Sequence, residues 1–405
     1  MQTRRTLLMA ATALLPVAAA AAPRRPGAHS ARGKDHGAEP DAAAGSPAST
    51  PLGPVNTVAR WAFITDFSTG ATLLEKEADA QMPPSSMTKL MTAYIVYGML
   101  SSGKLQLDQE LPVSERAWRM GGSKMFVPLG ASVKVEDLIR GMIVDSGNDA
   151  CIVLAEGIAG SEEQFVALMN AKAKELGLTN SNFANCTGWP DPSHHMSCRD
   201  IATLSRRLIA DFPKYYHYDS ETAVEYNNIK QGNRNALVWK GVADGLKTGH
   251  TDAGGFGQVS SANRNGRRVI VVLNGMSSMH ERAAESERML EWAFSQFENV
   301  TLYSAADVVE NAKVWLGASP TVPLVGGHDV VMTMPRSWHN SAKVEVAYAS
   351  PIPAPITRGQ EVGQLTVSGQ GVPSTSVPLL AGADVPRLGL PGRALAVLSH
   401  YVTGS

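Results

Sequence analysis

Two residues at the start of an apolar helical pattern could form a nucleophile and its base. Ser86 and Lys89 are three positions apart, so in a helix their side chains lie on neighbouring turns of one face. A lysine in this position can take the serine proton, and free backbone N–H groups at a helix start favour a developing oxyanion. A helix-capping serine followed by a surface lysine has the same spacing, and Ser101 and Lys104 repeat it where a helix would end. The spacing alone therefore does not establish an active site.

Two later segments carry polar groups that would suit a cleft around such a serine. Ser146 and Asn148 lie at a break between two apolar helical stretches, where they could present a hydroxyl and an amide. Lys247, Thr248 and Gly249 precede a strand pattern. A cation and a hydroxyl can bind a substrate carboxylate there, while glycine lets the backbone approach closely. A helix-capping loop would explain the first segment by itself, and an ordinary strand would explain the second. The segments are evidence for an active site because they occur together.

The composition is that of a globular protein without a nucleic-acid surface. The 405 residues include 44% apolar and 18% charged residues, and the length is sufficient for two domains and a large core. The formal net charge is −1, so no basic surface argues for nucleic acid as a partner. Three cysteines are too few for a disulfide scaffold.

The N-terminal part of the chain is expected to stay outside the fold. Residues 1–22 combine Arg4 and Arg5 with a short apolar run broken by Pro16, which predicts a signal peptide and a mature protein outside the cytoplasm. General and twin-arginine export both fit this pattern. Residues 23–57 are rich in Pro, Ala, Gly and Ser, so they predict a disordered linker.

Residues 58–298 predict one antiparallel sheet with strands from both ends of the segment and helices inserted between them. A hairpin is expected from Val58 to Glu77, and Asn265-Gly266 is a strong two-residue hairpin signal between two late strands. The expected helices run from Ser86 to about Leu100, from Val135 to Val144, from Ser161 to near Leu176, from Ser197 onward, and from about Glu281 to Phe297. Residues 299–386 are short apolar runs broken by Pro and Gly, which predicts a small all-β domain.

Taken in order, the three polar segments resemble the S-x-x-K, S-x-N and K-T-G motifs of serine enzymes that react with penicillin. The resemblance runs from Val58 to about Val385 and is carried by "PSSMTKLMTAY", "LIRGMIVDSGNDAC", "GWPDPSHHMSCRDIATLSRRL", "DGLKTGHTDAGG" and "VWLGASPTVPLVGGHDVVMTMPR". These segments are similar to the low-molecular-mass penicillin-binding proteins of the D-alanyl-D-alanine carboxypeptidase family. The resemblance implies a β-lactamase/transpeptidase-like α/β catalytic domain with a helical insertion, followed by the β domain.

The resemblance also implies chemical roles for the matching residues. Ser86 would be the nucleophile and Lys89 its base, while Ser146 would relay a proton to the leaving D-alanine. Asn148 would hold the substrate amide and help to orient Lys89. The backbone N–H groups of Ser86 and His250 would form the oxyanion hole.

The same resemblance places the substrate carboxylate beside cations. Lys247 and Thr248 would bind it next to Gly249, and Arg282, a looser match, would add to the positive field. Burial and the charge of Lys247 would lower the pKa of Lys89 and favour its neutral amine. The implied reaction removes the terminal D-alanine from peptidoglycan pentapeptide stems in the periplasm. β-Lactams would be covalent inhibitors, and neither a metal nor another cofactor would be required.

Three other functions are weighed against this one. A class A β-lactamase shares the motifs but deacylates through a glutamate-held water, and no E-x-x-L-N segment follows Ser146. An endopeptidase that cuts crosslinks would use the same residues, and the sequence does not reveal the reach of its cleft. A penicillin sensor with a dead site would not be expected to keep Ser86, Lys89, Ser146, Asn148 and Lys247.

The cysteines and the C-terminal tail leave further alternatives open. Cys151 is expected to be buried and unpaired, whereas Cys186 and Cys198 fit either a disulfide or two free thiols. A zinc site of Cys186, His194, His195 and Cys198 is discounted, because the spacing fits no standard zinc pattern.

The tail, residues 387–405, would be helical from Arg393. It would group Leu395, Leu398, Tyr401 and Val402, with His400 opposite. The tail has few basic residues and no Trp or Phe, so it predicts weak inner-membrane association at most.

Overall fold

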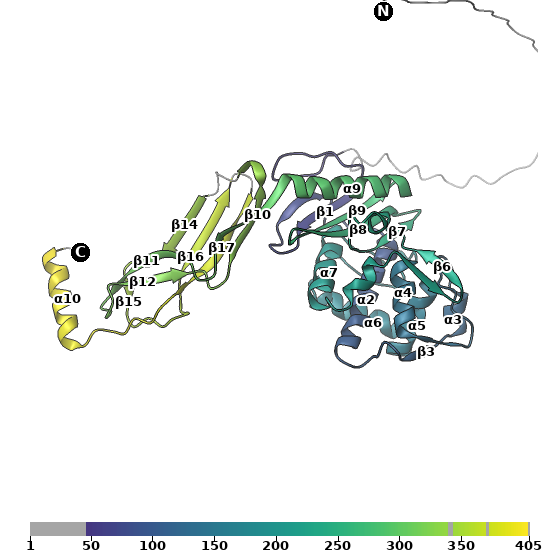
Figure 1. Cartoon of the computed structure of the whole chain (residues 1–405), viewed down its shortest axis with the longest axis horizontal. Coiled ribbons are helices and arrows are strands. Elements are labelled where there is room, and N and C mark those ends of the chain that lie inside the picture. The colour runs from purple at the N-terminus through teal and green to yellow at the C-terminus, as the bar shows by residue number, and fades with distance from the viewer. Residues whose placement is uncertain (1–45, 339–342, 370–371, 404–405) are drawn as a thin grey trace, which may run out of the picture. The chain divides into compact units, whose positions relative to one another are not determined.

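The computed structural model describes residues 46–338, 343–369 and 372–403 (Figure 1). The expected signal peptide and residues 23–45 of the expected linker lie outside the described residues.

A five-stranded antiparallel sheet forms the centre of the first folded region. Its strand order is β2-β1-β9-β8-β7, so strands from the beginning and the end of the region lie side by side, as the sequence predicts. The strands are β1 (Trp61–Asp66), β2 (Thr72–Lys76), β7 (Thr248–Thr251), β8 (Gly255–Arg264) and β9 (Arg267–Met276). The hairpin between β8 and β9 turns at Asn265 and Gly266, which have φ values of 52° and 83°. Both values lie in the left-handed region that this dipeptide tolerates.

The alternation of side chains along β9 explains why both faces of the sheet are covered. Ile270 and Val272 belong to the core beneath the helical insertion, whereas Val271 and Leu273 belong to a second core on the opposite face. The second core is closed by the helix α9 (Met279–Gln296) (Figure 1). The central strand is therefore apolar at five consecutive positions, Val269–Leu273.

The helical insertion starts and ends its helices largely where the sequence indicates. Ser161 and Ser197 cap α6 and α7 by accepting hydrogen bonds from the backbone N–H groups of Gln164 and Asp200. The helices are α2 (Lys89–Ser101), α3 (Glu115–Arg119), α4 (Val135–Val144), α5 (Asn148–Ala159), α6 (Glu162–Glu175), α7 (Cys198–Asp211) and α8 (Ala236–Trp239). Short 3₁₀ helices η1 (Ser85–Thr88) and η2 (Tyr216–Ser220) and the hairpins β3 (Glu110–Pro112) with β4 (Ser132–Lys134) and β5 (Ala223–Tyr226) with β6 (Ile229–Gly232) complete it.

The described end of the expected linker is folded, which corrects the boundary at residue 57. Ala48 is buried and pairs with Val55, and Ser49 pairs with Glu75 of β2. The hydroxyl of Thr57 donates to Glu285 Oε1 at 2.6 Å. These residues cover the otherwise unpaired edge of β2, a tertiary role that their small and polar composition does not reveal.

In its described residues, the second folded region is all-β apart from a short 3₁₀ turn, η3 (Arg336–Trp338). It contains a two-stranded sheet, β10-β13, and a six-stranded sheet in the order β14-β16-β17-β12-β11-β15. The strands are β10 (Phe297–Tyr303), β11 (Val308–Trp315), β12 (Thr321–Val325), β13 (Val330–Pro335), β14 (Lys343–Tyr348), β15 (Ile352–Pro353), β16 (Glu361–Gly369) and β17 (Val372–Ala381). Its core is aliphatic and includes Val322, Leu324, Leu365 and Leu379.

The tail forms a helix, α10 (Leu390–Thr403), which begins three residues before the expected start at Arg393. The side chains of Leu390 and Leu395 are exposed. Among the described residues, every helix is either too short or too polar to cross a membrane.

Candidate active site

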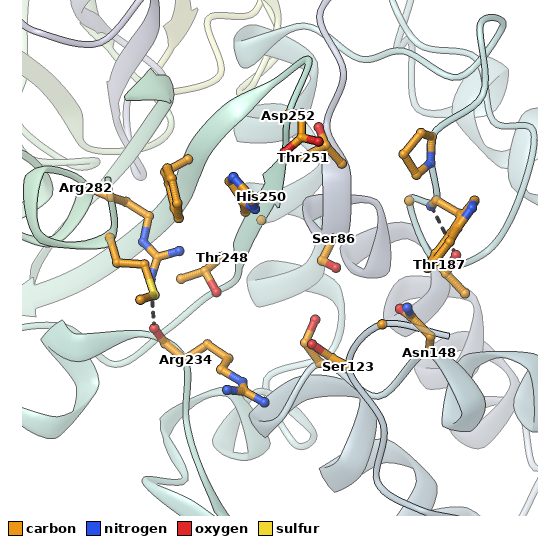
Figure 2. A pocket seen from close by; sticks show the side chains of 18 residues that line it. Ser86, Ser123, Asn148, Thr187, Arg234, Thr248, His250, Thr251, Asp252 and Arg282 are labelled. Carbon is orange, nitrogen blue, oxygen red and sulfur yellow. Dashed lines mark hydrogen bonds between the residues drawn. The ribbon is translucent and has the colours of Figure 1, made fainter. Parts of the chain in front are cut away.

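Most of the residues singled out in the sequence line one cavity of about 490 Å³. In Figure 2, Thr248 and His250 lie on one side of this cavity and Asn148 on the other, with Ser86 between them. The predicted residues that line it are Ser86, Ser146, Asn148, Thr248, Gly249, His250 and Arg282. Lys89 and Lys247 are almost completely buried and are not among the residues that line it.

Ser86 lies in a tight turn at the start of a helix, as predicted, but the first turn is 3₁₀ rather than α-helical. The turn η1 directly precedes α2, and Ser85 has a φ of 51°. The edge strand β7 approaches this turn so closely that a Cβ at Gly249 would lie 2.9 Å from Ser85 Cβ and 3.1 Å from Ser86 N. Glycine at this position therefore lets the strand lie directly against the serine.

Lys89 is fully buried and its Nζ contacts three oxygens. It lies 2.9 Å from Ser86 Oγ, 2.7 Å from Asn148 Oδ1 and 2.7 Å from the carbonyl oxygen of Thr187. Two of these oxygens can only accept hydrogen bonds. A neutral amine has two N–H groups and one lone pair, so serving both acceptors leaves the lone pair for the hydroxyl proton of Ser86. The contact set thus orients a base toward the serine.

The electrostatic environment favours the neutral form of this amine. Burial lowers the pKa of Lys89, and this effect outweighs the opposing influence of Cys151, Cys186 and the nearby acids Asp145 and Asp149. A lysine with a lowered pKa is available as a base nearer neutral pH than an exposed lysine would be.

The polar turn between α4 and α5 brings Ser146 and Asn148 to the same cavity. Ser146 has a φ of 68°, a strained conformation for a residue other than glycine. The Asn148 carboxamide is held at both ends, since Oδ1 accepts from Lys89 and Nδ2 donates to the carbonyl of Gly121 at 2.8 Å. Within the described residues, the hydroxyl of Ser146 makes no hydrogen bond, and it lines the cavity.

Two cations are buried on the other side of the cavity. Burial, with a further contribution from Lys89, lowers the pKa of Lys247 to about 7. Burial also lowers the pKa of Arg282 to about 10; its Nη2 donates to the carbonyl of Arg234 at 3.2 Å. No side chain of the described residues forms a hydrogen bond with Lys247 Nζ, so this ammonium can donate to a bound anion.

Sequence reasoning missed several residues that complete the cavity. Arg234, Trp189, Phe256 and Met279 line it, and Arg234 Nε donates to the carbonyl of Asp145 at 3.3 Å. Thr187 contributes through its backbone carbonyl. The sequence "QGNRN" around Arg234 contains no motif that would identify it as a cavity residue. The Thr187 carbonyl belongs to the backbone, so no residue type could have identified it.

The cysteines and histidines considered as a disulfide or a zinc site have separate partners. Cys151, Cys186 and Cys198 are all free and buried. Cys186 Sγ lies 3.3 Å from Glu162 Oε1, whereas Cys198 Sγ lies 3.9 Å from Met82 Sδ. The structure thus favours two free thiols over the Cys186–Cys198 disulfide.

His194, the buried histidine of the discounted zinc set, makes two hydrogen bonds of its own. One joins Nε2 to Thr88 Oγ1 at 2.8 Å, and in the other Nδ1 accepts from the backbone N–H of Ala184 at 3.1 Å. In the part of the chain that is described, no group of three or more His, Cys, Asp or Glu side chains is placed to hold a metal ion.

Comparison with known families and proteins agrees with this geometry. Residues 47–277 match the D-alanyl-D-alanine carboxypeptidase family, and residues 297–387 match the C-terminal domain of penicillin-binding protein 5. The chain is 37% identical to D-alanyl-D-alanine carboxypeptidase DacC of Escherichia coli over 344 residues, which cover 83% of this chain and 86% of that one. It is 35% identical to DacD of Salmonella typhimurium over 371 residues, covering 89% and 95% of the two chains.

Solved structures show the same fold. Penicillin-binding protein 5 of Haemophilus influenzae superposes with a TM-score of 0.76 at 34% identity, covering 82% of this chain and 99% of that one. DacD of Francisella tularensis superposes with a TM-score of 0.71 at 31% identity, covering 82% and 95%. The two matched regions, the shared fold and the serine–lysine cavity agree, and the chain belongs to the D-alanyl-D-alanine carboxypeptidase family.

Proposed function

We propose that this chain is a serine-type D-Ala-D-Ala carboxypeptidase that removes the terminal D-alanine from peptidoglycan pentapeptide stems, with Ser86 as its nucleophile. The observation that carries the assignment is the set of three contacts at Lys89 Nζ, because it directs the amine lone pair to Ser86 Oγ. Family membership supplies the reaction class.

The first half of the reaction forms an acyl-enzyme. Ser86 Oγ attacks the carbonyl carbon of the penultimate D-alanine while its proton passes to Lys89 Nζ. The backbone N–H groups of Ser86 and His250 hold the oxyanion. When the C–N bond breaks, Ser146 passes its proton to the leaving amine and takes the proton held by Lys89, so Lys89 is neutral again when D-alanine departs.

The second half restores the enzyme. A water molecule attacks the ester and gives its proton to Lys89, which returns a proton to Ser86 as the shortened stem leaves. In the first half, Lys247, Thr248 and Arg282 hold the carboxylate of the terminal D-alanine. This places the carboxylate at the Thr248 end of β7 and the body of the stem toward Thr251.

A labelling experiment tests the nucleophile. Ser86→Ala should abolish both labelling by fluorescent penicillin and release of D-alanine from a pentapeptide, with an unchanged circular dichroism spectrum. Ser85→Ala is the matched control, because Ser85 Oγ lies 3.0 Å from Thr251 Oγ1 and away from Lys89; it should still label. Labelling that persists in Ser86→Ala would place the nucleophile elsewhere.

β-Lactams are expected to acylate the same serine. Penicillin-binding protein D2 of Listeria monocytogenes, which has been solved in an ampicillin-bound form, is 28% identical to this chain and superposes with a TM-score of 0.55. The carboxylate of a β-lactam would use Lys247, Thr248 and Arg282 in place of the substrate carboxylate.

An endopeptidase activity is the second candidate. A D-alanyl-D-alanine endopeptidase of Pseudomonas aeruginosa is 28% identical to this chain over 247 residues, which cover 57% of this chain and 76% of that one. Product analysis distinguishes the two reactions. Released D-alanine indicates a carboxypeptidase, and separation of crosslinked stem dimers indicates an endopeptidase.

We further propose that residues 1–22 direct export and that the mature protein works in the periplasm, either free or weakly bound to the inner membrane through α10. N-terminal sequencing of the exported protein should begin near Ala22. Cell fractionation should release most of the protein in a high-salt wash. Retention through that wash, reversed by deleting residues 393–405, would instead show that the tail is an anchor.

A further inference from the structure

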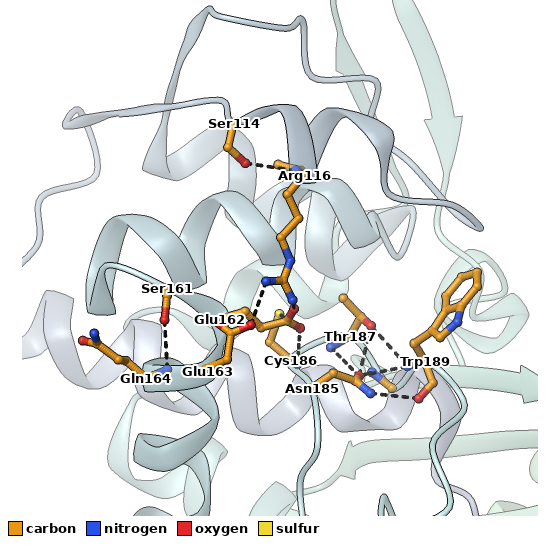
Figure 3. A network of polar contacts seen from close by, with 12 residues as sticks. Ser114, Arg116, Ser161, Glu162, Glu163, Gln164, Asn185, Cys186, Thr187 and Trp189 are labelled. Atoms are coloured by element: carbon orange, nitrogen blue, oxygen red, sulfur yellow. Dashed lines mark hydrogen bonds and ion pairs between the residues drawn. The ribbon is translucent and has the colours of Figure 1, made fainter.

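A single side chain organises the turn formed by residues 185–189. The Asn185 Oδ1 accepts hydrogen bonds from the backbone N–H groups of Thr187, Gly188 and Trp189 at 3.2, 2.8 and 3.0 Å and from the Thr187 hydroxyl at 3.1 Å. Its Nδ2 donates to the carbonyl of Trp189 at 2.9 Å. Figure 3 shows these bonds converging on the one carboxamide. The turn therefore takes its shape from Asn185.

This turn lies directly against the nucleophile and its base. The carbonyl of Thr187 accepts from Lys89 Nζ at 2.7 Å. Gly188 has a φ of 85°, and a Cβ there would lie 1.8 Å from the carbonyl oxygen of Ser85. The turn thus meets the catalytic segment at the residue before Ser86 and at Lys89, three residues after it.

One peptide unit connects Asn185 to Lys89. The Thr187 carbonyl and the Gly188 N–H belong to the same planar amide and point in opposite directions across it. Asn185 Oδ1 binds the N–H end at 2.8 Å, and Lys89 Nζ binds the carbonyl end at 2.7 Å. Rotation of this peptide would break both bonds together, and the bond at the N–H end also polarises the carbonyl.

We propose that Asn185 is a positioning residue of the reaction, which fixes the lone pair of Lys89 on Ser86 through the Thr187–Gly188 peptide. The direction of the lone pair depends on two carbonyl acceptors, Asn148 Oδ1 and the Thr187 carbonyl. Asn148 is held in place by its own hydrogen bond to the Gly121 carbonyl. If the Thr187 carbonyl were mobile, Asn148 Oδ1 would be the one fixed acceptor for Lys89 Nζ, and the amine could rotate about that bond. The proposal rests on the assignment of Ser86 and Lys89 as nucleophile and base.

The outer end of the segment has separate anchors that serve as a control. Asn170 Oδ1 accepts from the backbone N–H of Phe183 at 2.9 Å, and its Nδ2 donates to the Phe183 carbonyl at 2.8 Å. Asn170 therefore binds the same segment through a carboxamide without touching the peptide that faces Lys89. Asn170→Ala should lower stability without changing the chemistry at Ser86.

The test measures penicillin acylation per active site, after the sites have been counted by exhaustive labelling. Asn185→Ala should slow acylation about 10- to 100-fold, because displacing a reacting group by a small distance lowers the reaction rate by about this factor. The kcat for a pentapeptide should fall by a similar factor with little change in KM. Asn170→Ala should acylate at the wild-type rate per site.

A conservative variant separates positioning from a merely structural role. Asn185→Asp keeps an oxygen that accepts all four hydrogen bonds, so at high pH its acylation rate should recover to within about fivefold of wild type. Its negative charge should favour protonated Lys89 and move the acid limb of the pH profile to higher pH.

Wild-type rates per site in Asn185→Ala, an equal loss in Asn170→Ala, or an Asp variant that is as slow as Ala at every pH would each overturn the proposal. Failure of the wild-type protein to label at all would instead contradict the assignment of Ser86.

Discussion

Lys89 and Lys247 are both buried beside one cavity, yet their surroundings differ. Lys89 Nζ contacts three oxygens of the protein, whereas no hydrogen bond to Lys247 Nζ is formed by any described residue. Lys89 is thus fully bonded before substrate arrives, and Lys247 has donors left for a carboxylate. The proposed roles follow from this difference: Lys89, whose contacts are already made, would act as an oriented base, and Lys247, whose donors are free, would bind an anion.

The two lysines also depend on each other electrostatically. Lys89 contributes to lowering the pKa of Lys247, so protonation of one opposes protonation of the other. The proposed reaction requires Lys89 neutral and Lys247 charged. A carboxylate bound at Lys247 raises the pKa of that lysine, so substrate binding itself favours the charge distribution that catalysis requires.

The largest expected effect comes from exchanging each lysine for arginine. Lys89→Arg should lower kcat about 10²- to 10⁴-fold, because arginine stays protonated and cannot act as a base. Lys247→Arg keeps the positive charge, so its kcat should stay within about tenfold of wild type while KM rises. Steady-state release of D-alanine measures both. Equal losses of kcat in the two variants would contradict the separate roles.

The pH dependence of substrate binding should sharpen the comparison. The pKa of Lys247 is about 7, so its charged form is lost as pH rises through that value. KM should therefore increase above neutral pH, approaching about tenfold per pH unit if Lys247 provides most of the carboxylate binding. Lys247→Arg should have a nearly flat KM over pH 6–9, because arginine does not titrate there. A rise in KM that is identical in the two proteins would assign the titration to another group.

The contrast between the two sites also shows what sequence reasoning can reach. Ser86, Lys89, Ser146, Asn148 and Lys247 were identifiable because each lies at a helix start, a helix break or a strand start that local patterns mark. The hairpin of β8 and β9 was expected from the Asn265-Gly266 turn, and the sequence also predicted one antiparallel sheet with strands from both ends of the region.

The remaining features depend on contacts between distant parts of the chain. The Thr187 carbonyl is 98 residues from Lys89 in the sequence and belongs to the backbone, so no residue type announces it. Arg234 lines the cavity because the folded chain brings it beside residues that are distant in the sequence. In residues 46–57, Ser49 pairs with Glu75 at the edge of β2. In each case the signal is tertiary packing, which overrides composition and propensity.

A smaller effect is expected at Asp219, a carboxyl that is buried near Lys247. Burial raises the pKa of Asp219 to about 8, and neither carboxylate oxygen has a hydrogen-bond partner among the described residues. The folded state therefore keeps a proton that the unfolded chain releases above its ordinary pKa of 3.8. The wild-type free energy of unfolding should fall as pH rises from about 4 to 8.

Asp219→Asn removes this titration. Its stability should match wild type near pH 4 and exceed it at pH 8 by an amount on the order of a few kcal/mol. Urea unfolding at several pH values measures the difference. The kcat at pH 7 should change little, because Asp219 is already protonated there. A stability gain that is independent of pH would mean that Asp219 does not titrate in this range.

The smallest expected effect concerns the thiols behind Lys89. Cys151 and Cys186 are fully buried, and both are among the groups that act on the pKa of Lys89. Burial raises the pKa of the Cys151 thiol to about 12 and that of Cys186 well above its ordinary value, so both stay protonated and unreactive in the folded protein.

A thiol reagent should therefore leave the native protein unmodified and its penicillin acylation rate unchanged. After denaturation without reductant, the same reagent should count three thiols. A count of one would mean that two cysteines are bridged. Rapid modification of the native protein would mean that water reaches the apolar side of Lys89, and the burial that lowers its pKa would then be lost.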